Sequence, residues 1–148
     1  MTVTIKPLTE RDFFAWYELL LEFGADAHVE LSDENVMRIW TRLQTDDAHG
    51  VLATDALGKV VGLAHFETVT RLLQGDTATM IEDVYVAQRS RRQGVATALI
   101  EHIRTRSEEE HRSSVRWLAK PEDAAAKALF DKFAASTGGW VLHDLPVA

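Results

Sequence analysis

The chain has 148 residues, of which 46% are apolar and 26% are charged, and its formal net charge is −7. This size and balance are typical of a globule with a single core, so we expect one domain over residues 1–148. The negative charge argues against general affinity for nucleic acid, whose phosphates need a basic surface. The lack of cysteine excludes disulfides, thiolate metal ligands and a cysteine nucleophile.

No apolar run approaches the ~20 residues that are needed to cross a bilayer, so no membrane association is predicted. The first residues lack the charged-then-apolar order of a signal peptide, and we expect a cytoplasmic protein. His28 and His49 share no convincing pattern of metal ligands, and no metal is predicted.

The N-terminal part of the chain predicts one strand and two helices. Residues 2–6 alternate apolar and polar side chains, which is the pattern of a half-buried strand. Thr9 is a suitable N-cap for a helix that ends near Gly24. Ser32 is placed to cap a second helix, whose apolar side chains recur at helical spacing as far as Leu43.

The middle of the chain predicts a hairpin, a central strand and a third helix. Residues 51–54 and 60–69 flank a turn-like segment and together resemble a hairpin. Residues 77–86 are rich in β-branched and aromatic side chains, as in a central strand. Apolar residues then recur with helical period from Val95 to about Glu110.

The C-terminal part predicts a strand at residues 115–119, a helix that begins near Pro121, and a final strand at residues 140–145. The complete order is β-α-α-β-β-β-α-β-α-β. It implies an α/β (α+β) protein in which a mixed sheet is covered by helices.

The charged residues are not spread evenly along the chain. Arg89, Arg91 and Arg92 lie within four residues, whereas residues 22–34 carry acids and neither Lys nor Arg. A cationic spot on an acidic body suggests an anionic ligand at one place and a cationic ligand at another. The alternative is that both segments are ordinary solvated surface.

The segment from Ile81 to Ala98 has the organisation of an anion site. A strand runs into an arginine-rich loop with one glycine, and a helix follows at once. Unpaired backbone N–H groups and the dipole at a helix start favour negative charge. A Walker A loop would need the sequence Gly-Lys-Ser/Thr, and a dinucleotide-binding fingerprint would need three glycines. The loop of this segment has one glycine, Gly94.

The run RRQGVA at residues 91–96 matches the Arg/Gln-x-x-Gly-x-Gly/Ala motif of the GNAT acetyltransferase superfamily, and it follows a strand that reads IEDVYV. The sequence of this strand is most similar to that of the branch that contains the spermidine/spermine N-acetyltransferases. The order of elements also resembles the family over nearly the whole chain. The resemblance implies a GNAT-type, mostly antiparallel sheet flanked by about four helices, and one GNAT domain that uses acetyl-CoA as co-substrate.

The resemblance also implies which residues bind the cofactor, mostly through the main chain. The strand would pair with the pantetheine amides, and the loop would wrap the pyrophosphate. These roles fall on Val84, Tyr85, Val86, Arg91, Arg92, Gln93, Gly94, Val95, Ala96 and Thr97.

The second family motif, Asn-x-x-Ala-x-x-Leu-Tyr, is matched by DAAAKALF at residues 123–130. Asp123 replaces the asparagine, and Phe130 replaces a tyrosine whose hydroxyl often protonates the departing thiolate. The resemblance still places both residues at the cofactor, with Phe130 as a wall of its channel or as a core residue.

Transfer of an acetyl group to an amine needs a group that takes a proton, because amines are mostly protonated at neutral pH. The resemblance makes Glu82 the candidate base. Asp83 competes with it: alternation puts the two on opposite strand faces, but a bulge that is common here in the family could change this. Glu82 or Asp83 could instead simply pair with an arginine. His65 and Glu67 could face the same cleft, although a lone histidine in a strand is more often a structural residue.

These observations lead to the hypothesis of a GNAT-type N-acetyltransferase that acts by direct transfer in a ternary complex. The acidic residues 22–34 favour a small cationic acceptor, such as a polyamine, an amino acid or an amine-bearing drug, and a protein amine stays an alternative. Family analogy implies a homodimer. The rival hypothesis, motivated by Phe130, is a coenzyme A-binding sensor or regulator with little transferase activity.

Overall fold

In the computed structural model, which describes residues 2–147, the chain forms two compact units that join between Leu118 and Ala119. The first unit contains, in chain order, β1 (Thr4–Pro7), the short 3₁₀ helix η1 (Glu10–Asp12), α1 (Phe13–Asp26), α2 (Asp33–Arg42), β2 (Ala48–Thr54), β3 (Val60–Arg71), β4 (Asp76–Val86), the 3₁₀ helix η2 (Gln88–Ser90), α3 (Val95–Glu109) and β5 (Val115–Trp117). The second unit contains α4 (Ala124–Lys132).

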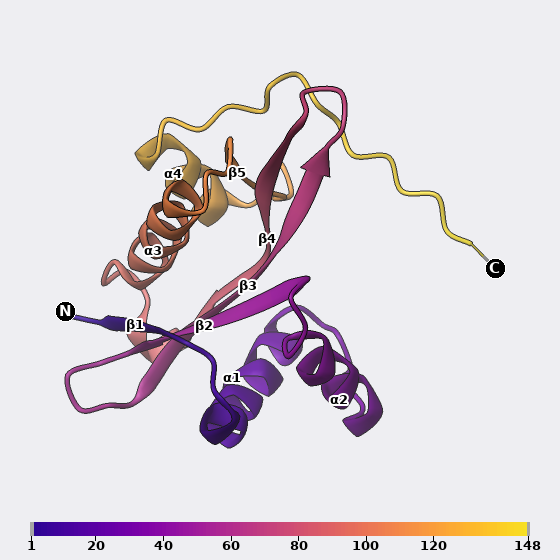
Figure 1. Cartoon of the computed structure of the whole chain (residues 1–148). Helices are drawn as coiled ribbons and strands as arrows, with labels where there is room; N and C mark the ends of the chain where they lie inside the picture. Colours follow the sequence, from indigo (N-terminus) through magenta and orange to yellow (C-terminus); the bar gives the residue numbers. More distant parts are fainter. Residues whose placement is uncertain (1, 148) are drawn as a thin grey trace. The chain divides into compact units, whose positions relative to one another are not determined.

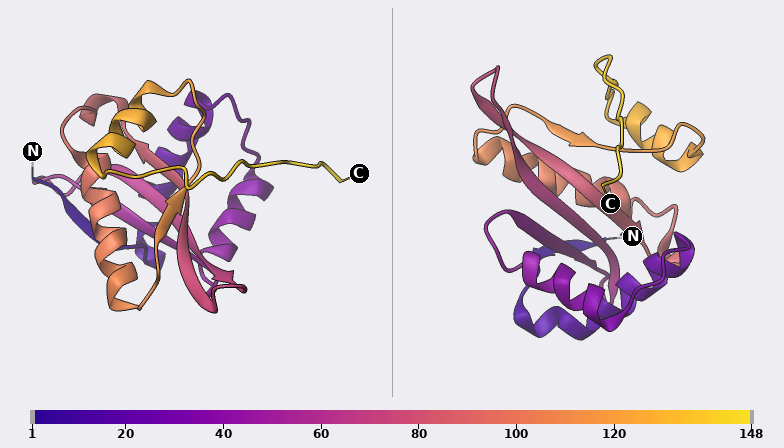
Figure 2. Two further views of the ribbon diagram at one scale, coloured as in Figure 1. Left: turned by 90° about the horizontal axis from the view of Figure 1, so that it is seen from above. Right: turned by 90° about the vertical axis from the view of Figure 1, so that its right-hand side faces the viewer.

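The five strands form one sheet in the order β1-β2-β3-β4-β5. All neighbours pair antiparallel except β4 and β5, which pair parallel over three residue pairs. The expected mixed, mostly antiparallel sheet with four α-helices is therefore confirmed in the described chain. Helices α1 and α2 cover one face of this sheet and α3 covers the other (Figures 1 and 2).

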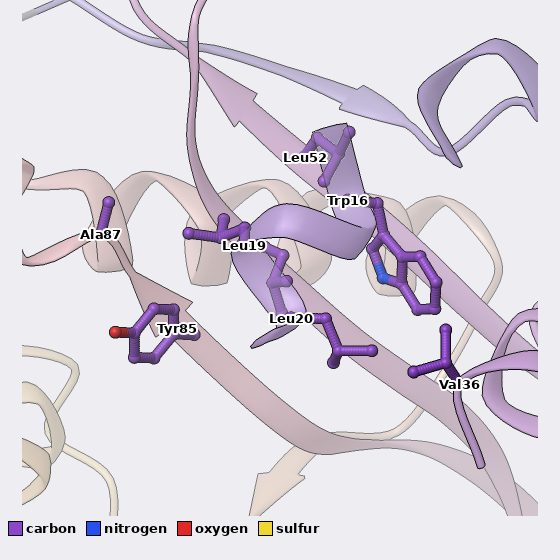
Figure 3. Close-up of a cluster of buried hydrophobic side chains, with 8 residues drawn as sticks. Trp16, Leu19, Leu20, Val36, Leu52, Tyr85 and Ala87 are labelled. Carbon is purple, nitrogen blue, oxygen red and sulfur yellow. The ribbon is translucent and has the colours of Figure 1, made fainter. Parts of the chain in front are cut away.

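The core between α1 and the sheet is built around one tryptophan. Trp16 has no exposed surface, and Leu19 and Leu20 follow it at helical spacing on the same face of α1. Figure 3 shows these three side chains between Tyr85 and Ala87 on one side and Val36 of α2 on the other. Burial of each such side chain contributes about 1.5–3 kcal/mol, so this cluster fixes α1 against β3 and β4.

The predicted helix starts are explained by their caps, with one change. The N–H of Asn35 donates to the Ser32 hydroxyl at 3.1 Å, which caps α2 as expected. Thr9 is the N-cap of η1 rather than of α1, and its N–H donates to the Asp12 carboxylate at 2.8 Å. Helix α1 begins directly after η1, at Phe13.

The predicted final strand at residues 140–145 is wrong, because these residues form neither strand nor helix. The segment has apolar residues, but Trp140 is 76% and Leu142 68% exposed. Sequence pattern alone does not make a strand, since its N–H and C=O groups must pair with a neighbouring strand. Within residues 2–147, no strand pairs with this segment. The other predicted elements are present with ends shifted by a few residues. Among the described residues, no helix is both long and apolar enough to cross a membrane.

Candidate active site

The pairing of β3 with β4 contains a bulge at Glu82. Ile81 lies opposite Phe66 and Asp83 lies opposite His65, so Glu82 is an extra residue with no partner on β3. A bulge of this kind re-aims the side chains around it and changes the alternation along the strand.

The bulge brings both predicted acids to the face of the sheet that α1 and α2 cover. His65 lies on that face and accepts a hydrogen bond from Trp16 of α1, and Asp83 lies directly opposite His65 in the strand pairing. Glu67 lies two residues along β3 and so shares the face of His65. The Glu82 carboxyl is within hydrogen-bonding reach of Glu67. Glu67, Glu82 and Asp83 are therefore gathered on one face, whereas simple alternation would have separated the last two.

The surroundings of Glu82 suit a group that takes up a proton. Its side chain is exposed at the surface of the described chain. Partial desolvation raises the pKa of Glu82 above the ordinary glutamate value, and the nearby carboxylates of Glu67 and then Asp83 raise it further. A base whose pKa is raised toward neutrality is better matched to proton transfer at physiological pH.

Asp83 has a different environment, because His65 holds its carboxylate. His65 Nδ1 lies 2.8 Å from Asp83 Oδ2, and the ring's Nε2 lies 2.9 Å from the indole nitrogen of Trp16. The His65 side chain is 7% exposed and that of Asp83 is 39% exposed. The sequence left open whether His65 has a structural role or faces the cleft. In the structure His65 is buried and contacts the carboxylate of Asp83.

The edge of β4 that faces β5 is open beyond the bulge. The last residue pair of β4 with β5 is Ile81 with Trp117, so residues 82–86 have no strand partner on that side within the described chain. The N–H of Ala87 donates to Val61 on β3. Hydrogen-bonded and non-hydrogen-bonded residues alternate along an antiparallel ladder. The N–H and C=O groups of Tyr85 therefore also point toward β3, whereas those of Val84 and Val86 point toward the open edge. The open edge offers amides of the kind that an extended, amide-bearing ligand can pair with.

The loop after β4 ends in a helix N-terminus without a side-chain cap. Gly94 is the N-cap of α3 and has a left-handed backbone, with φ of +82°. The N–H of Ala98 donates the first helical hydrogen bond to the carbonyl of Gly94, so the N–H groups of Val95, Ala96 and Thr97 have no helical acceptor. A Cβ built on Gly94 would meet nothing within 4 Å, which leaves space for an anion beside these amides.

The arginines of this loop pair with the acidic end of α1. Arg91 donates from Nη2 to Asp26 at 2.7 Å and from Nε to the carbonyl of Val86 at 3.1 Å. Arg89 lies 3.9 Å from Glu22. The interpretation of the two charged segments as sites for two ligands therefore needs correction. Arg89 and Arg91 of the basic segment pair with Glu22 and Asp26 of the acidic segment.

Tyr85 and Gln88 complete this contact between α1 and the loop. The Tyr85 hydroxyl lies 2.6 Å from Asp26 and 2.9 Å from Glu22, and the Gln88 side-chain amide donates to Asp26 at 3.1 Å. Burial, followed by these two hydrogen bonds and the charges of their carboxylates, raises the pKa of Tyr85. Its side chain stacks on Phe23 of α1, so Tyr85 is occupied on the helix side and is poorly suited to donate a proton to a ligand.

Two loop residues, the N-cap of α4 and one residue of α4 complete the predicted set. Arg92 and Gln93 are exposed, and Arg92 makes no hydrogen bond or ion pair with residues 2–147. In the second unit, the Asp123 carboxylate accepts from the N–H of Ala126 at 3.0 Å and so caps α4. Asp and Asn are both good N-caps, which explains the replacement of the family's asparagine. Phe130 lies in the following turns of α4.

Sequence reasoning did not connect Trp16, Asp26 or Glu22 with the predicted cofactor strand and loop. Trp16 lies among the apolar residues of the first predicted helix, and the two acids lie in the segment 22–34, which carries neither Lys nor Arg. Their contacts link residues that are 49, 65 and 63 positions apart in the chain, so no local pattern could have indicated them. No group of three or more potential metal ligands occurs among the described residues.

An open strand edge leads to an uncapped helix start, and carboxylates lie at a bulge beside it. This arrangement is of the kind that suits a long ligand with an anionic end. The family model described as acetyltransferase (GNAT) family matches residues 13–135. The chain belongs to this family and is an acetyl-CoA-dependent N-acetyltransferase.

Relatives of known structure or activity agree with the family assignment. The D-amino-acid N-acetyltransferase HPA3 of Saccharomyces cerevisiae is 26% identical over 138 residues, which cover 91% of this chain and 86% of the relative. The ribosomal-protein-alanine N-acetyltransferase of Brucella melitensis biovar Abortus 2308 has a TM-score of 0.82 at 22% identity and covers 99% of this chain and 100% of its own. The aminoglycoside acetyltransferase meta-AAC0020, from an uncultured soil metagenomic sample, in complex with sisomicin has a TM-score of 0.84 at 19% identity, with coverages of 99% and 96%. Both structures share the fold of this chain.

Proposed function

We propose that the enzyme transfers the acetyl group of acetyl-CoA directly to a primary amine of a small cationic acceptor. The observation that carries this proposal is the bulge at Glu82, which gathers Glu67, Glu82 and Asp83 on one face of β4 and its neighbour. Carboxylates in this number attract a cationic amine and provide a group to deprotonate it.

In this proposal the cofactor binds along the open edge of β4 and at the start of α3. Val84 would pair its outward N–H and C=O groups, and Val86 its outward N–H, with the pantetheine amides, while Tyr85 supports the strand from the other side. The amides from Gly94 to Thr97 would receive the pyrophosphate, with Arg92 as an additional cation. Arg91 holds the loop in place through Asp26 rather than binding the phosphate with its side chain.

In the proposed reaction Glu82 takes a proton from the bound ammonium, and the neutral amine nitrogen attacks the thioester carbonyl carbon. The new C–N bond forms as the C–S bond breaks, and coenzyme A leaves as the thiolate. The remaining excess proton on the nitrogen passes to the thiolate or to water, which gives the neutral amide. No covalent enzyme intermediate is needed, which is consistent with the lack of cysteine. The raised pKa of Glu82 supports its choice over Asp83, which is held by His65.

Charge separates the candidate acceptors. An amino acid carries a carboxylate next to its amine, and this group would be repelled by the three acids of the site. Polyamines and amine-bearing antibiotics carry additional cations, which the same acids attract. HPA3 is named for D-amino acids, whereas meta-AAC0020 is in complex with sisomicin and AAC(6')-Iy is in complex with the bisubstrate analogue CoA-S-monomethyl-acetylneamine. The carboxylates of this chain favour the second kind of acceptor.

The deciding experiment measures thiol release from acetyl-CoA with a panel of amines. We expect turnover with polyamines or aminoglycosides, at KM values that rise with ionic strength because salt screens the acids of the site. Amino acids should be poor acceptors. Preference for a D-amino acid would contradict the charge argument, and tight binding of acetyl-CoA without turnover on any amine would favour the coenzyme A sensor instead.

Four expectations from the sequence accompany this proposal. We propose that both units form one catalytic domain, since the family match runs from residue 13 to residue 135 across their junction. The homodimer and the cytoplasmic location stay predictions, as does the closer resemblance to the spermidine/spermine branch.

A further inference from the structure

A chain of hydrogen bonds runs from the core below α1 to the site carboxylates. Trp16 Nε1 lies 2.9 Å from His65 Nε2, and His65 Nδ1 lies 2.8 Å from Asp83 Oδ2. Trp16 is fully buried and His65 is 6% exposed. The Trp16–His65 part of this chain therefore lies in the packed interior, where a hydrogen bond is electrostatically stronger than in water.

The chain selects one tautomer of His65. An indole N–H can donate but never accept, so Nε2 of His65 must be the unprotonated, accepting nitrogen. The ring proton then lies on Nδ1 and is donated to Asp83. Trp16 thus determines that His65 acts toward Asp83 as a donor.

The result is a carboxylate with one oxygen fixed and one available. Oδ2 of Asp83 accepts from His65, and within residues 2–147 no hydrogen bond to Oδ1 is present. The Asp83 side chain is 39% exposed. Glu82 adjoins it on the same face, and the two acids differ because the Glu82 carboxyl is turned toward Glu67.

We propose that Trp16 and His65 are positioning residues of the transferase: they hold Asp83 so that its available oxygen receives a second cationic group of the acceptor, beside the amine that Glu82 deprotonates. This inference rests on the proposed function. It assigns recognition of acceptor charge to Asp83 and proton transfer to Glu82, and it makes a diamine a better acceptor than a monoamine of equal length.

Two substitutions at His65 separate positioning from packing. His65→Leu fills the space of the ring but removes the donor to Asp83, whereas His65→Asn retains an N–H at the place of Nδ1. We expect His65→Leu to raise the KM for a diamine about tenfold, which matches the loss of one charge-assisted hydrogen bond. The KM for the monoamine, kcat and the affinity for acetyl-CoA should change less than about threefold, and His65→Asn should restore most of the diamine KM.

Trp16→Phe tests the other end of the chain and keeps an aromatic ring in the core. The ¹⁵N spectrum of the His65 ring should report the Nδ1–H tautomer in the wild type and a population of Nε2–H in Trp16→Phe, together with a raised KM for the diamine. This variant and the wild-type spectrum decide the question if His65→Leu does not fold.

Several results would overturn the inference. These are an Nε2–H tautomer in the wild type, an equal rise in KM for diamine and monoamine, or a diamine KM that is unchanged in both Trp16→Phe and His65→Leu. A wild type that acetylates no amine would overturn the proposed function, and the inference with it. Normal turnover by the wild type, with a diamine KM that neither His65→Leu nor Trp16→Phe changes, would overturn this inference and leave the proposed function intact.

Discussion

The hydroxyl of Tyr85 lies 2.6 Å from the carboxylate of Asp26, and this contact joins β4 to the last turn of α1. Arg91 of the loop reaches the same carboxylate oxygen at 2.7 Å. One acid therefore holds both the strand that would carry the pantetheine and the loop that would carry the pyrophosphate. Because both the strand and the loop depend on Asp26, we expect stability and cofactor binding to be linked at this position.

Replacement of Asp26 by Asn should destabilise the protein in a pH-dependent way. Hydrogen bonds from Tyr85 and then from Arg91 hold the pKa of Asp26 below its ordinary value. A lowered folded-state pKa means that the stabilisation is present above the unfolded pKa of ~3.9 and is lost as the pH falls through the folded value. The melting temperature of Asp26→Asn should be below that of the wild type at neutral pH, with a difference that shrinks below about pH 4.

The control for this experiment is Asp47→Asn, which changes an exposed aspartate outside the network. It should leave both the melting temperature and the affinity for acetyl-CoA unchanged. Asp26→Asn should weaken acetyl-CoA binding, because the loop loses its anchor. Equal melting curves for the two variants at every pH would show that the network does not stabilise the fold.

The second prediction concerns Gly94 and uses a matched glycine. Gly94 and Gly58 both have positive φ values, of +82° and +79°, and a Cβ at either would meet nothing within 4 Å. Alanine at each should therefore cost a similar ~1–2 kcal/mol of backbone strain. Only Gly94→Ala should weaken acetyl-CoA binding, since its methyl group enters the space next to the helix amides.

Calorimetric titration of both folded variants with acetyl-CoA provides the measurement. Comparable melting temperatures would confirm that the strain is matched, so that any difference in affinity is attributable to the site. If Gly94→Ala binds as tightly as Gly58→Ala, the start of α3 is not the phosphate site.

The sequence was most informative where the site depends on neighbouring residues. The strand, the loop with Gly94 and the start of α3 form one continuous segment, so local pattern and resemblance located them together. The bulge was different, because residue alternation could not decide whether Glu82 and Asp83 share a face. The pairing of Arg91 with Asp26 spans 65 positions and depends on how α1 packs on the sheet. The predicted strand at residues 140–145 failed for the same reason, since a strand requires a partner that its own sequence does not contain.

The third prediction tests Glu82 as the base. Glu82→Gln should lower kcat by roughly 10²- to 10⁴-fold, the usual range for loss of general acid–base catalysis. The fall in rate at low pH should also disappear, because that limb reports protonation of Glu82. A loss below about threefold with the limb intact would assign the proton to Asp83 or to water.

The fourth prediction changes a neighbour of the base and has a defined sign. The carboxylate of Glu67 helps to raise the pKa of Glu82, after desolvation. In Glu67→Gln that like charge is absent, so the pKa of Glu82 should fall and the acid limb of the rate profile should move to lower pH. The rate on the plateau should stay within about threefold of the wild type. A limb that stays in place would show that Glu67 does not influence the group that limits the rate.

The last prediction follows from Phe130, which stands where the family motif has a tyrosine. Tyr85 cannot readily replace the missing acid, because its hydroxyl is engaged by Glu22 and Asp26 and its pKa is raised. A departing thiolate resembles that of cysteine, with a reference pKa of ~8.5, and so leaves tolerably without a proton. We therefore expect Phe130→Tyr to raise kcat, most clearly below neutral pH, where protonation of the sulfur helps most. A hydroxyl buried without a partner would cost ~1–3 kcal/mol, so the melting temperature must be measured with the rate. If the variant is folded, binds acetyl-CoA normally and is no faster at any pH, position 130 is not a vacant acid position, and the missing tyrosine carries no information about mechanism.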